Sequence, residues 1–553
     1  MRREMKTGWH YVAALLLGCA LVGFYLSIIV PLAYAPGVVP DSSYYIEIAR
    51  NFLAGKGLVM TGELSDLPAA TVPLSFWPPG YPMSVAFLSW LSGMDPVRMA
   101  PRVVWACWAF LPAALLFALR PILRSWYVYI VIALVMFSPG AITESWLPMT
   151  DLPFLLLTVL SFGLLFRGAG AAVRPLPLLL SGLTCGLAYG VRNVGVASFA
   201  AILGAYAVLA LLRIVGAKPA LQKLAWWGIG AALVVVPLIV RNLIVFHALQ
   251  PYTMGPSTLG YSGNIRYYVS ATLGDIIAGH TIQHVVTWNN MILLAVAVAA
   301  VAAAWLVRTG TARIWSGLPP ASKEILVLLC AYVVAGAAVV IAARSRYEWG
   351  EFIGPRHVLQ YDWILLGLAA FLTERWARPS RAALSAILIA AILLAGQRFQ
   401  FASRELAMRR EEAATTMRTQ DPSALAGMKT GSFRLATNLL ITRDPQLLEA
   451  IRDLPPATVL VSNYDNVLRL VSGRMVHSLY ANGECDLPKL AEFNARKDVA
   501  RNRMVLLLFA DPALLETGCW QRLAQSPQAG AVNVTRPYFL SFNLQTGRDV
   551  EPR

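Results

Sequence analysis

Long apolar runs separated by short polar stretches dominate the first 400 residues of the chain. A helix needs about 20 apolar residues to cross a bilayer core of about 30 Å, and runs near that length recur here. They predict about 11 membrane-spanning helices, within a range of 11–13. The candidate spans lie near residues 9–33, 97–119, 126–140, 148–166, 175–190, 194–212, 225–245, 288–307, 324–343, 357–373 and 383–398.

A large hydrophilic loop at residues 34–95 follows the first span. Within it, residues 81–92 are apolar but too few to cross a bilayer. We therefore predict that they form a helix lying in the membrane interface.

The composition agrees with this pattern. Hydrophobic residues make up 57% of the chain and charged residues only 14%, with a mean hydropathy of +0.58. Soluble domains carry about 25% charged residues, so a soluble or disordered protein is excluded. The sequence predicts an α-helical polytopic membrane protein.

The net charge of +16 is a topology signal. With a cytoplasmic N-terminus, the short cytoplasmic connections hold 16 basic residues against three acidic ones. This is the positive-inside rule, and it gives no support to nucleic-acid binding. An odd number of spans then places the C-terminal segment outside the cytoplasm.

The chain therefore divides into a membrane domain at 1–400, with the loop 34–95 inserted in it, and an extracytoplasmic domain at 401–553. Strand-like runs at 457–463, 474–480 and 503–510 surround a helix-like run, which predicts a small α/β sheet with parallel pairing. An oxidising compartment would allow Cys485 and Cys519 of this domain to form a disulfide.

The first external loop carries the strongest candidate chemistry. Its sequence DSSYYIEIARNFLAGKG is followed by WPPGYP. Asp41 lies just beyond a membrane span, where a carboxylate can stay ionised and act as a general base on a lipid-anchored substrate. Alternatively, Asp41 is the N-cap of a helix at 42–54, and the two roles are compatible.

This loop resembles that of the GT-C superfamily of polyprenyl-phosphate-sugar-dependent membrane glycosyltransferases, which includes protein O-mannosyltransferases, aminoarabinose transferases of lipid A and rhizobial galacturonosyltransferases. The chain departs from the usual Asp-Glu pair by having Ser42. The resemblance implies a GT-C fold in a bacterial inner membrane, with Asp41 as the catalytic carboxylate. The matching residues are Asp41, Tyr45, Ala49, Arg50, Pro78 and Pro79, and the candidate substrate contacts are Tyr44, Tyr45, Lys56 and Tyr81.

A second acidic motif, TESWLPMTDLP, stands at the external start of the fourth span. Acidic groups at the mouth of a span are costly and usually functional. The resemblance implies a carboxylate here, for which Asp151 is the better match and Glu144 the weaker one, with a role in orienting the acceptor or binding a metal. Helix capping by Thr150 or Asp151 is the alternative.

Cationic residues form a third group at the predicted external face. Arg192 lies between the fifth and sixth spans, and Arg344, Arg346, Arg356 and His357 lie before the tenth. An arginine fork suits phosphate oxygens, so these residues are candidates for binding the donor phosphate. Snorkelling to lipid headgroups is the alternative for any one of them.

Metal binding is open at this stage. His280 and His284 have a spacing that could ligate zinc on a helix, but no glutamate lies between them in the metalloprotease arrangement. No cofactor is predicted with certainty, and a divalent metal ion is the one candidate.

We therefore predict a membrane glycosyltransferase that moves a sugar from a polyprenyl-phosphate carrier to an extracytoplasmic glycan, lipid or protein in one inverting displacement. A transporter or flippase for a lipid-linked saccharide is the main alternative. It is disfavoured because the charged candidates gather on one face. A non-catalytic membrane scaffold is the third.

Overall fold

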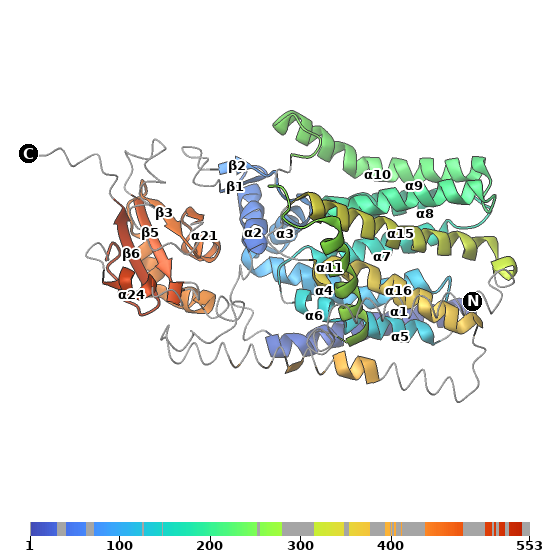
Figure 1. Ribbon diagram of the computed structural model, residues 1–553, viewed down its shortest axis with the longest axis horizontal. Coiled ribbons are helices and arrows are strands. Elements are labelled where there is room, and N and C mark those ends of the chain that lie inside the picture. Colours follow the sequence, from blue (N-terminus) through green and yellow to red (C-terminus); the bar gives the residue numbers. More distant parts are fainter. Residues whose placement is uncertain are drawn as a thin grey trace, which may run out of the picture. The chain divides into compact units, whose positions relative to one another are not determined.

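Figure 1 shows a computed structural model of the chain. The structure describes residues 2–29, 40–61, 71–123, 126–145, 147–251, 255–278, 315–347, 353–376, 393–398, 437–478, 504–510, 519–525 and 530–544, with a few isolated positions between them.

The chain forms two compact units. The first comprises Met1–Phe24, Ser75–Tyr81 and Val103–Arg404, and the second comprises Tyr25–Leu74, Pro82–Arg102 and Glu405–Arg553. Most of the first external loop thus belongs to the same unit as the C-terminal segment. This grouping could not be read from the order of the sequence.

The first unit is built of helices, several of which run alongside one another in Figure 1. Helix α8 packs against α7 and α10, and α15 packs against α9. The helices are α1 (Arg2–Ile29), α4 (Pro96–Leu119), α5 (Tyr127–Met136), α6 (Pro139–Ser145), α7 (Asp151–Arg167), α8 (Pro175–Val191), α9 (Val196–Leu211), α10 (Ala217–Phe246), α11 (Tyr261–Leu273), α15 (Pro320–Arg346) and α16 (Pro355–Trp376), with a 3-10 turn η2 (Asn193–Gly195) and a π-helical turn η3 (Gly274–Ala278).

Four helices in the described ranges are long and apolar enough to cross a membrane: α4, the η2–α9 segment, α10 and α15. Helices α5 and α6 form a fifth candidate that bends by 50°. Few side chains of α10 are buried, and Leu233 and Ile244 are exposed, as expected of a helix that faces lipid. The predicted multi-pass helical membrane protein is confirmed. The span predicted at 288–307 lies outside the described residues.

The predicted interfacial segment is a helix, α3 (Gly80–Ser92). Its exposed apolar side chains are Met83, Phe87, Trp90 and Leu91. Their spacing of three and four residues puts them on one face, which suits a helix that lies on an apolar surface.

Glycines bring α8 and α10 unusually close. Gly182, Gly186 and Gly190 recur every fourth residue of α8, and a Cβ on Gly182 would collide with the backbone carbonyl of Trp227 in α10. A Cβ on Gly230 of α10 would likewise collide with the carbonyl of Leu179. Lipid tails are as apolar as leucine, so helices in membranes associate through close backbone packing of this kind.

The charged residues of α15 are confined to its two ends. Near its start, Lys223 of α10 lies 2.7 Å from the Glu324 carboxylate, and both side chains are fully buried. Tyr206 also donates a hydrogen bond to Glu324. Near its end, Arg344 donates a hydrogen bond of 2.8 Å to Ser257. Twenty residues separate Glu324 from Arg344, or about 30 Å of helix, the thickness of a bilayer core.

The second unit contains a four-stranded sheet in the order β4-β3-β5-β6. Strand β3 pairs in parallel with β4 and β5, and β5 pairs antiparallel with β6. The first three strands coincide with the predicted strand-like runs. The elements are β3 (Val459–Ser462), β4 (Val476–Ser478), β5 (Met504–Phe509) and β6 (Phe539–Leu544), with α20 (Pro445–Arg452), α21 (Asp465–Ser472) and α24 (Cys519–Ala524).

The same unit contains the first-loop elements α2 (Pro40–Leu53), β1 (Val59–Thr61) and β2 (Thr71–Pro73). Strands β1 and β2 pair antiparallel. The Gly-Lys-Gly turn after α2 needs glycine, because Gly55 and Gly57 both have positive φ, at 75° and 81°.

We expect Gly182→Ala to destabilise the protein by about 1–3 kcal/mol, because the added methyl group overpacks the contact between α8 and α10. Gly204→Ala is the matched control: Gly204 lies in α9 with open space around its Cβ position. It should leave stability unchanged or raise it by up to about 1 kcal/mol through helix propensity. Thermal denaturation of the detergent-solubilised protein measures both, and equal midpoints for the two variants would contradict this packing.

Candidate active site

Asp41 lies in the first turn of α2, since the helix begins at Pro40. It is therefore inside the helix and not the N-cap of a helix at 42–54. The residue is partly exposed, and it sits where the helix dipole favours negative charge.

Four polar residues share one row of α2. Asp41, Tyr44, Glu47 and Arg50 are each partly exposed, and all the residues between them are buried. Residues three apart are neighbours on a helix surface. From Asp41 to Arg50, the half-open face of α2 thus consists of these four side chains.

Arg469 of α21 binds the middle of this row. Its guanidinium donates hydrogen bonds to Glu47 at 3.1 Å, to Asp465 at 2.6 Å and to Asn466 at 2.8 Å. Its Cζ atom also stands 4.3 Å from the centre of the Tyr44 ring. Burial lowers the pKa of Arg469, but Asp465 and Glu47 outweigh it and leave that pKa above its ordinary value, so the side chain stays charged.

Glu47 is held on both carboxylate oxygens. Oε1 accepts hydrogen bonds from the backbone N–H of Thr61 at 2.7 Å and from the Thr61 hydroxyl, while Oε2 accepts the bond from Arg469. Glu47 therefore joins α2, β1 and α21, and a carboxylate committed in this way is poorly suited to take a proton from a substrate.

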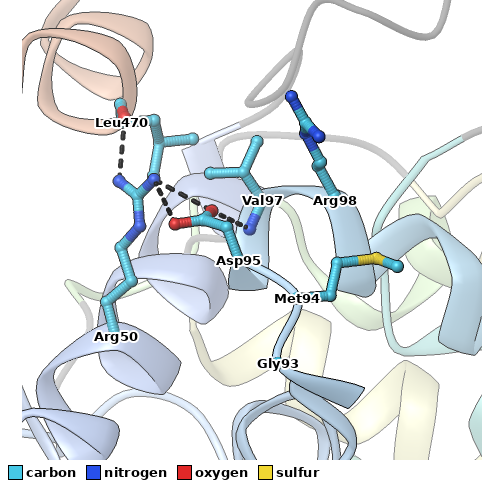
Figure 2. Close-up of a pocket in the computed structure, with 7 residues that line it drawn as sticks. All are labelled: Arg50, Gly93, Met94, Asp95, Val97, Arg98 and Leu470. Atoms are coloured by element: carbon cyan, nitrogen blue, oxygen red, sulfur yellow. Dashed lines mark hydrogen bonds and ion pairs between the residues drawn. The ribbon is translucent and has the colours of Figure 1, made fainter. Parts of the chain in front are cut away.

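Arg50 ends the row. It bonds to the Asp95 carboxylate at 3.0 Å and to the Leu470 carbonyl at 2.8 Å. Figure 2 shows this arrangement in an open pocket of about 400 Å³, where Arg98 points away from the Arg50–Asp95 pair. Asp95 also accepts a bond from the backbone N–H of Val97, which fixes the start of α4.

The other candidate substrate contacts differ in exposure. Tyr45 and Tyr81 are buried, whereas Lys56 is exposed in the turn between Gly55 and Gly57. The structure therefore gives Tyr44 and Lys56 more access to a ligand than Tyr45 and Tyr81.

In the first unit, Asp151 and Arg192 form an ion pair. The Asp151 side chain is 1% exposed and that of Arg192 is 18% exposed, so a buried carboxylate holds a cation that reaches the surface. Thr150 occupies the N-cap position of α7 without a capping bond from its side chain. Capping by Thr150, the alternative predicted from the sequence, is therefore wrong.

The WPPGYP motif reaches the same neighbourhood. A Cβ on Gly80 would collide with the carbonyl of Gly190, two residues before Arg192. Only glycine permits this approach, so the motif packs directly on the end of α8. Gly190 is also the last of the close-packed glycines of that helix.

Glu144 is buried in α6, the helix that precedes Asp151. The start of α6 is fixed by Asp275, whose carboxylate accepts a 2.8 Å hydrogen bond from the backbone N–H of Gly140. Arg398 in turn donates hydrogen bonds to the carbonyls of Asp275 and Ile276 in the π-helical turn η3. π-helical turns are rare in proteins, and those that occur are frequently found at functional sites.

The remaining cationic candidates occupy two places. Arg344 is buried against Ser257, whereas Arg346 is exposed and stands over the Tyr347 ring at 5.4 Å. Arg356 and His357 lie in the first turn of α16. His357 Nδ1 accepts a 3.1 Å hydrogen bond from the Gly354 N–H.

Two predictions reach beyond the described residues. Cys519 is disulfide-bonded, and Cys19, Cys107, Cys185 and Cys330 are free. Cys485 lies outside the described residues, so its pairing with Cys519 stays a prediction. His280 and His284 also lie outside them, and among the residues that are described no cluster of three or more acidic, His or Cys side chains could hold a metal ion.

Glu47, Arg469, Asp275 and Arg398 were not predicted as site residues. For Glu47, the sequence contains a signal: the polar row Asp-x-x-Tyr-x-x-Glu-x-x-Arg along α2. For Asp275 and Arg398, the partners come from segments distant in sequence, and no local pattern marks them. Arg469 has the i, i+4 spacing of a helical ion pair with Asp465, but its contact with Glu47 is distant in sequence.

Comparison with known proteins gives consistent results. Residues 14–252 match the family model for dolichyl-phosphate-mannose-protein mannosyltransferases. The fold is similar to that of ArnT from Cupriavidus metallidurans bound to undecaprenyl phosphate, with a TM-score of 0.56 and 13% identity over 99% of this chain and 100% of that one. Its apo state gives a TM-score of 0.51 at 13% identity, over 98% and 99%.

The oligosaccharyltransferase of Archaeoglobus fulgidus, in complex with Zn and sulfate, is also similar. The TM-score is 0.51 at 12% identity, covering 90% of this chain and 68% of that one. A comparison with curated protein sequences gives no match. At these identities the structural likeness shows the fold, and together with the family match it confirms the predicted resemblance.

We expect Arg192→Gln to destabilise the protein by about 2–4 kcal/mol, because it leaves the buried Asp151 carboxylate without its counter-ion. Adding Asp151→Asn should recover much of that loss, since no buried charge then remains. Denaturation midpoints of the two single variants and the double variant measure the coupling. Costs that simply add would show that the ion pair does not hold these two segments together.

Proposed function

We propose that this chain is a membrane glycosyltransferase of the GT-C superfamily, which transfers a sugar from a polyprenyl-phosphate carrier to an acceptor outside the cytoplasm. The observation that carries the proposal is the half-open row of α2, which presents the partly exposed Asp41 in the first turn of the helix, two steps along the row from Glu47. The donor class is supported by the similarity in fold to ArnT bound to undecaprenyl phosphate.

We place the protein in a bacterial inner membrane with a cytoplasmic N-terminus, about 11 spans and the domain at 401–553 outside. The charge distribution supports this orientation. The buried Lys223–Glu324 pair and Arg344 at opposite ends of α15 are consistent with it, because the sequence assigns them to opposite faces.

Asp41 is the proposed general base. An acceptor hydroxyl attacks the anomeric carbon of the sugar, the bond from that carbon to the phosphate oxygen breaks, and the electron pair leaves with the phosphate. Asp41 takes the hydroxyl proton. The products are the glycosylated acceptor and polyprenyl phosphate, and a single displacement inverts the anomeric configuration.

Arg192 is the proposed contact for the donor phosphate, with Arg356 as a second cation. The arginine fork suits phosphate oxygens, and the ion pair with Asp151 fixes the position of the Arg192 guanidinium. A fixed guanidinium stabilises the charge that grows on the leaving phosphate without reorganising during the reaction. We therefore propose that Asp151 orients Arg192. Glu144, buried one helix earlier, is the candidate for orienting the acceptor.

The test is release of polyprenyl phosphate from a panel of polyprenyl-phosphate sugars by the purified protein, with a membrane extract as the source of acceptors. We expect turnover with one donor and a loss of about 100-fold or more in Asp41→Asn, because general-base catalysis contributes about 10²–10⁴-fold.

The matched control is Asp453→Asn, which removes an exposed carboxylate at the end of α20 in the same unit. It should retain full turnover. Undiminished activity of Asp41→Asn would remove the base from this mechanism, and no turnover with any donor would refute the proposed function.

A further inference from the structure

The C-terminal part of the second unit contacts α2 at Ser43 and at three members of its polar row, Tyr44, Glu47 and Arg50. From the α21 side, Asn466 accepts a 3.0 Å hydrogen bond from Ser43, Arg469 binds Tyr44 and Glu47, and the Leu470 carbonyl accepts from Arg50. The contacts advance together along both helices, so α2 and α21 run side by side in the same direction.

Arg469 is the centre of this contact. Its side chain is 4% exposed, as is that of Asp465, and that of Glu47 is 15% exposed. One buried cation thus serves a carboxylate from each helix. Removing one partner of such a set leaves an uncompensated buried charge, which costs far more than the loss of one hydrogen bond between neutral groups.

The geometry of the arginine fork fixes both position and rotation. Nη1 bonds to Glu47, whereas Nη2 bonds to Asp465 and Asn466. Asp465 and Asn466 anchor the guanidinium to α21, so Glu47 can meet Nη1 only at one rotation of α2 about its axis. Asp41 lies two steps along the same row, and its direction follows from that rotation.

We infer that Arg469 is a positioning residue for the reaction: it locks the rotation of α2 and so aims the carboxylate of Asp41. This inference rests on the proposed function. It makes the C-terminal domain part of the catalytic apparatus, through a residue that does not touch the substrate. A displacement of about 1 Å at a reacting group costs about 100-fold in rate, so a small loosening of α2 is enough.

The experiment compares Arg469→Ala and Arg469→Lys with the wild type. In Arg469→Ala we expect kcat to fall by about 10–100-fold, because the base is misaimed. The donor KM should stay within about threefold, because Arg469 does not bind the donor. Arg469→Lys should give an intermediate kcat, since it keeps the charge but cannot bond all three partners at once.

Hydrogen exchange of the amides at residues 42–50, measured by mass spectrometry, gives a readout that needs no activity. Exchange should rise in Arg469→Ala. The matched control is Arg522→Ala, which removes an exposed arginine of α24 in the same domain and should change neither exchange nor kcat.

Faster exchange together with a lower kcat supports the inference. Faster exchange with an unchanged kcat overturns it, because α2 could then move without harm to catalysis. Unchanged exchange overturns it too, whatever the kcat. A wild type that turns over no donor would instead refute the proposed function, and the exchange data would still report whether Arg469 holds α2.

Discussion

The buried contact between Arg469 and Glu47 joins segments that are 422 residues apart in the sequence. It connects α2, which follows the first predicted span, to α21, the helix between β3 and β4 of the C-terminal sheet. Because Glu47 also accepts bonds from Thr61, the same carboxylate fixes β1. The first external loop thus takes its shape from the C-terminal domain, and the proposed base depends on a domain that the order of the chain puts last.

Two different forces organise the first unit. Close glycine packing brings α8 and α10 together where lipid gives no hydrophobic driving force. Buried ion pairs then tie the helix ends: Lys223 with Glu324, and Asp151 with Arg192. Gly190 takes part in the glycine packing and lies two residues before Arg192 of the Asp151–Arg192 pair. It is the last of the close-packed glycines of α8, and Gly80 packs against its carbonyl. The loop motif is thereby anchored next to Arg192.

Much of this could be predicted from the sequence, since hydropathy and charge are local properties. They locate α4, α9, α10 and α15, and alternation of strand-like and helix-like runs locates β3, α21, β4 and β5. Asp41 is found by motif. The partners of Glu47 and Asp275 are not, because a contact between distant segments leaves no periodic trace. The pairing of Asp151 with Arg192 could not be predicted from the sequence either, because Asp151 lies at the start of α7 and Arg192 directly follows α8.

One measurement tests the central claim, which is that the acceptor hydroxyl, activated by the Asp41 carboxylate, displaces the phosphate from the sugar in a single step. The purified protein is supplied with the donor that it turns over and with the acceptor extract. The anomeric configuration of the transferred sugar is then compared by NMR with that in the donor. We expect inversion, because the acceptor attacks opposite the departing phosphate. Retention would require a covalent or second displacement step and would contradict a mechanism in which Asp41 acts only as a base.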